Sequence, residues 1–279
     1  MKRLEAELAE AHALDVGHLA DAIESIGFEC TRCGACCRAV SAGADLADDD
    51  GADPPDDDGA DPPDDDGPER PGGDGPERPG GDGADPHTAT VFPDEVRRLV
   101  DGSGETLDAD YDWRDVARPM PYGLDGGADD GETFEWALQT DVCGDCTFYR
   151  EGEADAPGAC TVHGDRPLVC QTYPFSVGAV ERGRRNDDEG GGTGGLGTTE
   201  PMGGLVEREG MVRAHECEGL GRDISREDAA ELAATLKERA IRELEEAIGV
   251  RDTYEPAAVD GLVVHDSEGP KRPDGSRLR

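Results

Sequence analysis

Four cysteines fall within eight residues near the start of this 279-residue chain, in the run CTRCGACC at Cys30–Cys37. Thiolates this close together, with Gly34 permitting a positive φ, can converge on one soft metal centre. The first three have the C-x₂-C-x₂-C spacing that also opens a bacterial ferredoxin run. The fourth, Cys37, directly follows Cys36 in the sequence. Because neighbouring side chains point in different directions, we expect Cys36 and Cys37 to serve different sites, or one of them only to pack.

A second set of cysteines lies far along the chain, at Cys143, Cys146, Cys160, Cys170 and Cys217. The charged N-terminus, Met1–Glu10, has no apolar stretch of the kind found in signal peptides. Nine cysteines in such a chain indicate metal or redox chemistry rather than disulfides. No apolar run is long enough to cross a bilayer. We therefore expect a cytoplasmic protein without a membrane partner.

Charge and composition limit the function further. The net charge is −39, from 27 basic and 66 acidic residues spread along the chain, and aromatic residues make up only 4%. This composition is typical of proteins from salt-accumulating halophiles. It argues against a nucleic-acid partner, which needs clustered positive charge. With 40 Gly and 19 Pro, the chain predicts a thin apolar core that bound metal would supplement.

Helical segments are expected at both ends of the chain. Residues 2–14 carry an apolar stripe, and Asp15 can cap a second helix that Gly27 ends. Ser225 and Asp228 resemble a capping box that begins a C-terminal helix. We divide the chain into N-terminal helices at 1–27, a cysteine-cluster domain at 28–42 and 87–222, a disordered acidic insertion at 43–86, a helix at 223–249 that Gly249 ends, and a polar tail at 250–279 that frays from Pro270.

The cysteine-cluster domain is expected to contain short strands. The insertion repeats GADPPDDD and GPERPGGD twice each, and its polarity cannot offset the entropy of ordering. We predict strands at 90–92, at 134–138 with alternating burial, and at 175–179 with its hairpin partner at 205–212. A helix runs from Pro93 to Val100, and residues 101–131 and 183–204 form loops. The fold class is thus α+β, a small metal-stapled domain with short strands, flanked by N-terminal helices and a C-terminal helix.

The motifs around the later cysteines point to a known family. They are Cys146-Thr-Phe148, Gly158-Ala-Cys160-Thr-Val-His163, Arg166-Pro-Leu-Val-Cys170 and Cys217-Glu-Gly219. With the first run, their order resembles the YkgJ-type cysteine cluster family (CxxCxxCC) of zinc- or iron-chelating proteins, over residues 28–42 and 88–222. The resemblance implies eight metal ligands: Cys30, Cys33, Cys36, Cys37, Cys146, Cys160, Cys170 and Cys217. Cys143 falls outside the pattern, and His163 stands where the family often has Tyr.

Eight thiols make two tetrathiolate sites, or one cluster with spare thiols. The cofactor is then an iron–sulfur cluster, which the ferredoxin-like spacing favours slightly, or zinc. The role is electron transfer to a protein redox partner, or metal handling. One alternative is an S-adenosylmethionine-dependent protein lysine methylase-like enzyme, because some relatives carry such a cluster. However, no Gly-rich loop follows a clear strand here. Another alternative is an interaction module in which zinc only folds the chain.

Several neighbours of the cysteines are candidates for supporting roles. Three arginines, Arg32, Arg38 and Arg166, either offset the thiolate charge and lower thiol pKa values, or are simply solvated. Two histidines, His163 and His215, are alternative zinc ligands. The segment 173–175 predicts an apolar lid. Cys143 and Cys146 form a CxxC spacing that suits chelation, but a thioredoxin-like redox pair would need a following helix, which the sequence disfavours.

The acidic composition predicts a stability that depends on salt. At ~1 M salt the Debye length is about 3 Å, so repulsion among the acidic side chains is largely screened. We expect the melting temperature to rise steeply from low to molar potassium chloride, as followed by circular dichroism. A melting temperature that stays flat over this range would contradict the interpretation.

Overall fold

The computed structural model describes residues 2–41, 84–106, 110–121, 130–152, 157–178, 203–257 and 259–278, and shows a mixed α+β architecture. Six α-helices and several small sheets make up the described part. Nearly all of the acidic repeat segment and of the Gly-rich segment at 183–204 lies outside these residues. Among the helices of the described residues, none has the length and apolarity needed to cross a membrane.

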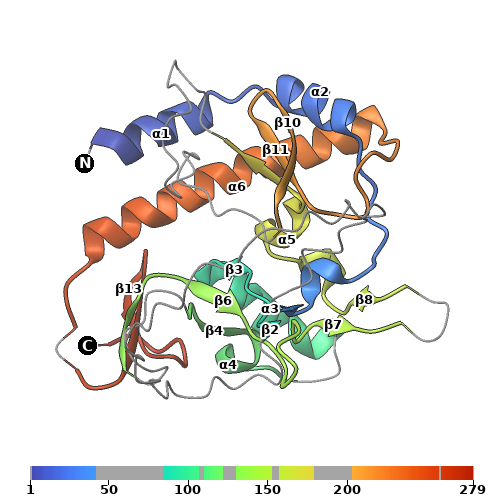
Figure 1. Ribbon diagram of the computed structural model, residues 1–279. Coiled ribbons are helices and arrows are strands. Elements are labelled where there is room, and N and C mark those ends of the chain that lie inside the picture. Colours follow the sequence, from blue (N-terminus) through green and yellow to red (C-terminus); the bar gives the residue numbers. More distant parts are fainter. Residues whose placement is uncertain are drawn as a thin grey trace, which may run out of the picture.

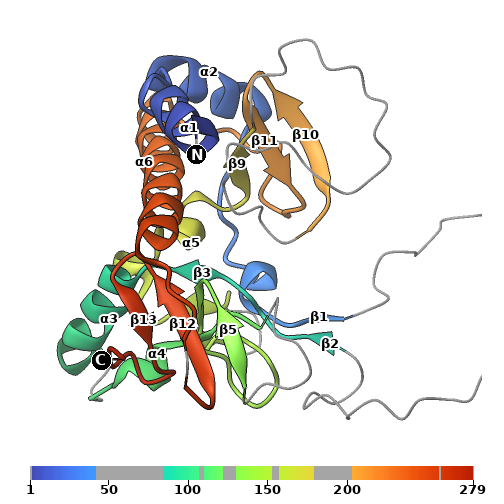
Figure 2. The same ribbon diagram turned by 90° about the vertical axis from the view of Figure 1, so that its left-hand side faces the viewer.

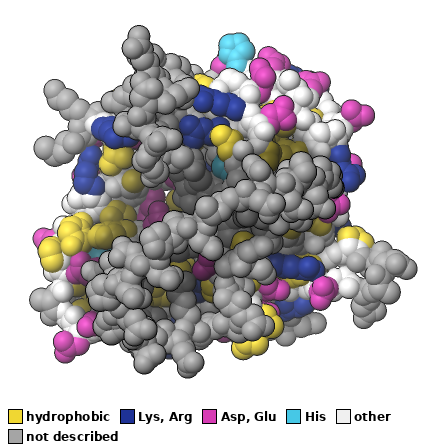
Figure 3. Space-filling view, in the orientation of Figure 1, with side chains coloured by type: hydrophobic (Ala, Val, Ile, Leu, Met, Phe, Trp, Pro, Cys, Tyr) yellow, Lys and Arg dark blue, Asp and Glu magenta, His cyan; other side chains and the backbone are white. Residues whose placement is uncertain are grey.

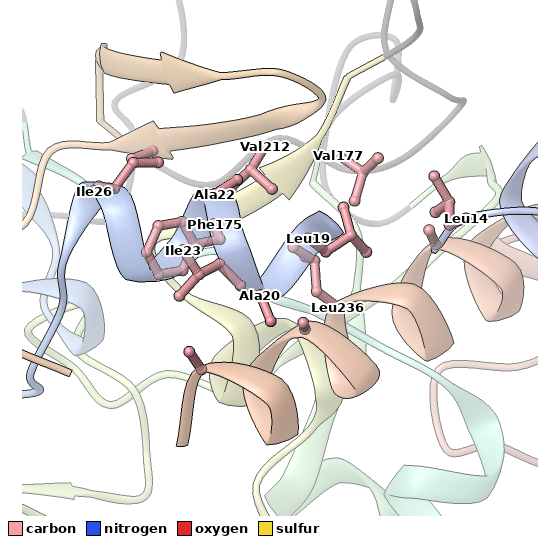
Figure 4. Packing of buried hydrophobic residues seen from close by; sticks show 14 of the residues in the cluster. Leu14, Leu19, Ala20, Ala22, Ile23, Ile26, Phe175, Val177, Val212 and Leu236 are labelled. Carbon is pink, nitrogen blue, oxygen red and sulfur yellow. The ribbon is translucent and has the colours of Figure 1, made fainter. Parts of the chain in front are cut away.

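Helices dominate one half of the molecule, at the top of Figure 1. α1 (Lys2–His12) and α2 (Val16–Ile26) pack against the long α6 (Arg226–Thr253). The expected caps of α2 are confirmed: Asp15 Oδ1 accepts a hydrogen bond from His18 N at 2.9 Å, and Gly27 ends the helix with φ 76°. Apolar side chains of α2 and α6 meet Phe175 and Val212 in a first hydrophobic core (Figure 4).

α6 begins as predicted but ends later. Ser225 Oγ accepts a hydrogen bond from Asp228 N at 3.1 Å, which satisfies a free donor of the first turn. The expected stop at Gly249 is wrong, because the helix continues to Thr253. A Cβ at position 249 would lie 2.5 Å from the Cβ of Ser267. Gly249 therefore serves close packing rather than helix termination.

A three-stranded sheet in the order β10-β11-β9 covers this core. β9 (Phe175–Val177) was expected as a strand and is fully buried. The predicted hairpin partner at 205–212 is wrong in extent. It is divided between two strands, of which β10 (Leu205–Glu209) is the exposed outer strand and β11 (Val212–His215) pairs with β9. Met211 and Gly210 form the turn between β10 and β11, inside the range that the sequence assigned to one strand.

The other half of the molecule is built from short strands around a second core. β6 (Trp136–Leu138) lies between β3 (Thr90–Val91) and β4 (Ala117–Pro119). The predicted alternation is wrong, because all three residues of β6 are buried, while Phe134 precedes the strand and is 46% exposed. Two helices flank this sheet: α3 (Pro93–Thr106), longer than expected, and α4 (Trp113–Val116), which falls in the segment expected to be loop-rich.

The C-terminal tail is ordered, contrary to the predicted fraying. β12 (Leu262–Asp266) pairs in parallel with β5 (Gly131–Thr133) and antiparallel with β13 (Gly269–Lys271). The buried Lys271 Nζ lies 2.6 Å from Asp266 Oδ2, which also accepts a hydrogen bond from Trp136 Nε1 at 2.9 Å. This buried pair anchors the tail to the second core. The anchor depends on Trp136 and Asp266, which are 130 positions apart in the sequence. The polarity of the tail alone therefore could not predict it.

The remaining elements are short. They are α5 (Leu168–Thr172), the 3₁₀ turns Ala35–Cys37 and His163–Asp165, the ladder of β7 (Tyr149–Arg150) with β8 (Ala159–Cys160), and that of β1 (Val40–Ser41) with β2 (Ala84–Asp85). Figure 2 shows α5 and the blue segment with the first 3₁₀ turn between the helical half and the strand half. The first cysteine run therefore crosses from one core to the other.

Glu268, in the turn between β12 and β13, gives a pH test of the anchored tail. Arg97 of α3 donates to Glu268 Oε1 at 2.6 Å, and Lys271 Nζ donates to Oε2 at 2.9 Å. The Arg97 hydrogen bond, followed by that from Lys271, lowers the pKa of Glu268 from 4.5 to about 2. A carboxylate with a lowered pKa stabilises the fold above its unfolded pKa, and this contribution is lost as the pH falls toward 2.

We therefore expect Glu268→Gln to lose on the order of 1 kcal/mol of unfolding free energy near neutral pH, because solvent screens the ion pairs of a partly exposed carboxylate. The difference from the wild type should shrink between pH 4.5 and 2. Urea unfolding at several pH values measures it, with the exposed Glu238→Gln as the control. A difference that is independent of pH would show that Glu268 acts through packing alone.

Candidate metal centre

The first cysteine run is a tight turn built on Gly34. Gly34 adopts a left-handed conformation (φ 80°, ψ −1°), and Cys37 N donates to Gly34 O at 2.8 Å to close the 3₁₀ turn. The Tyr149 ring lies against Gly34 and Gly158, where a Cβ at either position would overlap it. The sequence-based expectation of a positive φ at Gly34 is confirmed, and close packing adds a second reason for glycine there.

Backbone contacts fix both ends of the run against later cysteine segments. Glu29 N donates to Gly219 O at 3.0 Å, which brings Cys30 beside the segment of Cys217. Cys146 N donates to Cys37 O at 2.8 Å, which joins the other end of the run to the second set. The run thus spans the distance between two groups of cysteines that are far apart in the sequence.

The second set is carried by a turn, a ladder and a short helix. Asp141 Oδ1 accepts from Cys143 N at 2.8 Å and from Asp145 N at 3.1 Å, and so shapes the turn before Cys146. Cys160 lies opposite Tyr149 in the β7–β8 ladder. Cys170 sits in α5, where its N–H donates to Pro167 O at 2.9 Å.

A cavity of about 400 Å³ lies at this junction and is lined by thiols. Its wall includes all eight cysteines that the resemblance implies as ligands: Cys30, Cys33, Cys36, Cys37, Cys146, Cys160, Cys170 and Cys217. Cys143 is exposed and does not belong to the wall. The lining also draws on both halves of the molecule, with Phe28 from one and Leu138 and Phe148 from the other. Five separate segments therefore deliver cysteines to one place.

Thiols are ligands that a soft metal prefers, but here they line the cavity wall and do not surround a single metal position. Cys36 Sγ and Cys37 Sγ are 3.8 Å apart. A tetrahedral zinc site with Zn–S bonds of about 2.3 Å separates its sulfurs by a similar ~3.8 Å. Among the described residues, no group of three or more His, Cys, Asp or Glu side chains stands in an arrangement that could hold a metal ion. Binding would require thiol side chains to turn inward from the wall.

Burial favours the protonated form of several of these thiols by raising their pKa values. It raises the pKa of Cys146 to about 12, and it is also the largest cause that raises the pKa values of Cys160, Cys170 and Cys217. The pKa of Cys36 is also raised, first by the hydrogen bond with Cys37 and then by burial. A metal cation reverses this effect by favouring the thiolate. The raised pKa of Cys146, together with a turn and a strand after it instead of a helix, disfavours a thioredoxin-like pair with Cys143.

The three neighbouring arginines differ in what they contact. The positive charge of Arg166 lowers the pKa values of Cys36, Cys160 and Cys170, against the larger effect of burial. Arg38 instead donates to the Tyr149 hydroxyl at 2.8 Å and to Glu151 at 2.9 Å. Arg166 thus has the electrostatic role expected for the arginines, and Arg32 also lines the cavity.

The structure distinguishes the two candidate histidines from each other and tests the predicted lid. His163 lines the cavity, whereas His215 does not: its Nε2 lies 3.1 Å from Ser176 Oγ and its Nδ1 lies 3.3 Å from Gly203 O. The predicted lid is only partly correct. Tyr173 lines the cavity and donates its hydroxyl hydrogen to Glu216 O, but Phe175 is buried in the first core.

His87 is a feature of the site that sequence reasoning missed. Its side chain is 3% exposed, it lines the cavity, and neither ring nitrogen has a hydrogen-bond partner among the described residues. Burial lowers the pKa of His87 to about 4, so the ring is neutral at pH 7. The residue directly follows the acidic insertion, and no cysteine motif includes it. An unpartnered polar group at this place is consistent with a cavity that receives a polar or metallic occupant.

Comparisons with known proteins do not identify the chain. No protein-family model matches it, and neither a curated protein nor a solved structure matches.

Glu95 positions the helix that carries Cys170. It is 2% exposed, and its carboxylate accepts hydrogen bonds from Phe92 N at 3.0 Å and from Leu168 N at 2.9 Å. These bonds satisfy the N–H of the residue before α3 and a free donor of the first turn of α5, and so join the two helices.

We therefore expect Glu95→Ala to lower the unfolding free energy by about 1–3 kcal/mol, because a buried and a partly buried N–H group lose their acceptor. Denaturant unfolding measures the loss. The exposed Glu238→Ala on α6 is the matched control and should change stability by less than about 0.5 kcal/mol. Equal effects of the two substitutions would contradict this role of Glu95.

Proposed function

We propose that this protein is a metal-binding cysteine-cluster protein that holds an iron–sulfur cluster or zinc in the thiol-lined cavity. The observation that supports it most is the convergence of eight of the nine cysteines, from five segments, on one cavity. Four of the eight lie outside both hydrophobic cores, namely Cys30, Cys33, Cys36 and Cys217, whereas Cys146 belongs to the second core and Cys37, Cys160 and Cys170 pack against it. Seven of the eight remain at least partly exposed, and only Cys146 is buried.

The proposal gives the metal a structural effect as well. The cavity lies between two small cores, and metal binding to ligands from both halves contributes directly to folding free energy. A metal-stapled domain would therefore be stabilised where the apolar packing is divided. Membership of the YkgJ-type family belongs to the same proposal and rests on the sequence motifs. A cytoplasmic location is also proposed, and it rests on the charged N-terminal segment and the cysteine content.

The position of the cavity favours metal handling over an enclosed electron-transfer centre. Cys30 is exposed, so at least one thiol of the set is reachable from solvent. Metal exchange requires such access, whereas low exposure protects an iron–sulfur cluster from water and oxygen. The methylase-like and interaction-module alternatives rest on the resemblance and on composition, and no contact in the described residues favours either.

Anaerobic purification with metal and acid-labile sulfide analysis tests the proposal. An iron–sulfur cluster gives iron, sulfide and broad visible absorption, and zinc gives metal without colour. Either result supports metal binding. Purified protein that contains neither, and that binds neither on reconstitution, would exclude the proposed function.

Cysteine variants provide a second test. Cys143→Ser should retain full metal stoichiometry, because Cys143 lies outside the cavity wall. Cys33→Ser and Cys170→Ser should lose metal and become sensitive to protease, because an open coordination position sacrifices binding energy that is also folding energy. If Cys143→Ser loses metal as severely as Cys146→Ser, the two residues act as a CxxC chelate pair and the assignment of ligands is wrong.

A further inference from the structure

The cavity between the two halves is larger than a single metal ion requires. Its volume is about 400 Å³. A cavity needs only about 10–15 Å³ to hold a water molecule, and a divalent ion is no larger than that. Sites for small organic molecules in proteins have volumes of about 300–1,000 Å³. The cavity therefore has the size of an organic ligand site.

One part of the cavity wall is apolar and belongs to the protein interior. Leu138, Phe148 and Val162 line the cavity and are 2%, 1% and 5% exposed. All three belong to the second hydrophobic core, and Phe28 adds an aromatic ring that packs against the first core. None of these side chains can donate or accept a hydrogen bond. An occupant that lies against this part of the wall must therefore be apolar.

Another part of the wall is basic, in contrast to the acidic character of the chain. Arg32 is exposed, Arg166 is half-buried, and both line the cavity. Neither of them forms an ion pair with a carboxylate among the described residues. By comparison, Arg97, Arg226 and Arg251 each have a carboxylate oxygen at 2.6–2.8 Å. Two arginines without such partners at one cavity fit an anionic occupant.

The local backbone holds both arginines at the wall. Arg32 has φ 59° and is the only residue other than glycine with a positive φ in the described part of the chain. Residues in this rarely populated conformation are concentrated at binding and active sites. Arg166 Nε donates to His163 O at 3.0 Å, and Gln171 Nε2 donates to Arg166 O at 2.5 Å. The terminal guanidinium nitrogens of Arg166 have no hydrogen-bond partner within the described ranges, so they can bind a ligand.

From the apolar and basic parts of this wall, we infer that the cavity binds a small organic carboxylate. Its apolar body lies against the interior part of the wall, and its carboxylate lies at Arg32 and Arg166. The inference goes beyond the proposed metal binding, because it requires neither thiolates nor a metal.

The head group follows from the arginines and from the net charge. The planar guanidinium group matches a carboxylate with two parallel hydrogen bonds. It also matches a phosphate, but a phosphate carries more negative charge. A single negative charge is easier to accommodate in a protein with a net charge of −39.

Isothermal titration calorimetry of the full chain with 2-naphthoate tests the site, at one salt concentration at which circular dichroism shows a folded chain. We expect one naphthoate to bind per chain. The neutral 2-naphthamide has nearly the same shape and should bind about tenfold more weakly, because it loses the charge-assisted hydrogen bonds. Acetate, which has the charge without the apolar body, should show no binding at the same concentrations.

Arginine variants locate the head group. Arg32→Gln and Arg166→Gln should each weaken the binding of naphthoate about tenfold. Both variants should bind naphthamide as the wild type does, which also shows that the cavity remains folded. Arg222→Gln is the matched control, because Arg222 is exposed and lies outside the cavity wall, and it should change neither affinity.

Several outcomes would overturn the inference. Equal affinities for naphthoate and naphthamide would exclude an anionic head group. Equal losses in Arg222→Gln and Arg32→Gln would attribute the binding to net charge alone. Tighter binding of 2-naphthyl phosphate than of naphthoate would exclude the choice of a carboxylate. If naphthoate does not bind at all, the site is excluded, while metal analysis of the same preparation decides separately whether the proposed function holds.

Discussion

Two backbone hydrogen bonds, one at each end of the first cysteine run, determine where the thiols of this protein meet. Glu29 N to Gly219 O fixes the outer end, and Cys146 N to Cys37 O fixes the inner end. Between them the chain has only eight residues and turns at Gly34, so its thiols are confined to the gap between the two hydrophobic cores. Every later cysteine except Cys143 is then delivered to the same gap by an element of one of the two halves.

The apolar packing of the described residues is divided between the two halves. Each half has a core of its own, built from α2, α6 and β9 in one case and from β3, β6 and α3 in the other. Acidic side chains are spread over the described part of the surface that faces the viewer in Figure 3, and they repel one another at low salt. A metal centre with ligands from both halves would stabilise the contact between them without a larger apolar core.

Local chemistry was sufficient to predict several caps, turns and strands of the mixed α+β fold, whereas the eight cysteines of the cavity wall were indicated by the family resemblance. The caps at Asp15 and Ser225, the turn at Gly34 and the strand at Phe175 follow from residues close together in sequence. The tail could not be predicted in this way, because Lys271 is held by Asp266, which in turn is tied to Trp136 far away. His87 escaped notice for a related reason: its burial beside the cavity depends on segments that only the fold brings together.

The central claim is that the convergent thiols coordinate metal. X-ray absorption at the metal edge of the protein as purified measures the atoms around the metal directly. The account predicts a first shell of sulfur alone, at about 2.3 Å for zinc. A first shell dominated by oxygen or nitrogen would place the metal elsewhere on this acidic chain and would contradict the account.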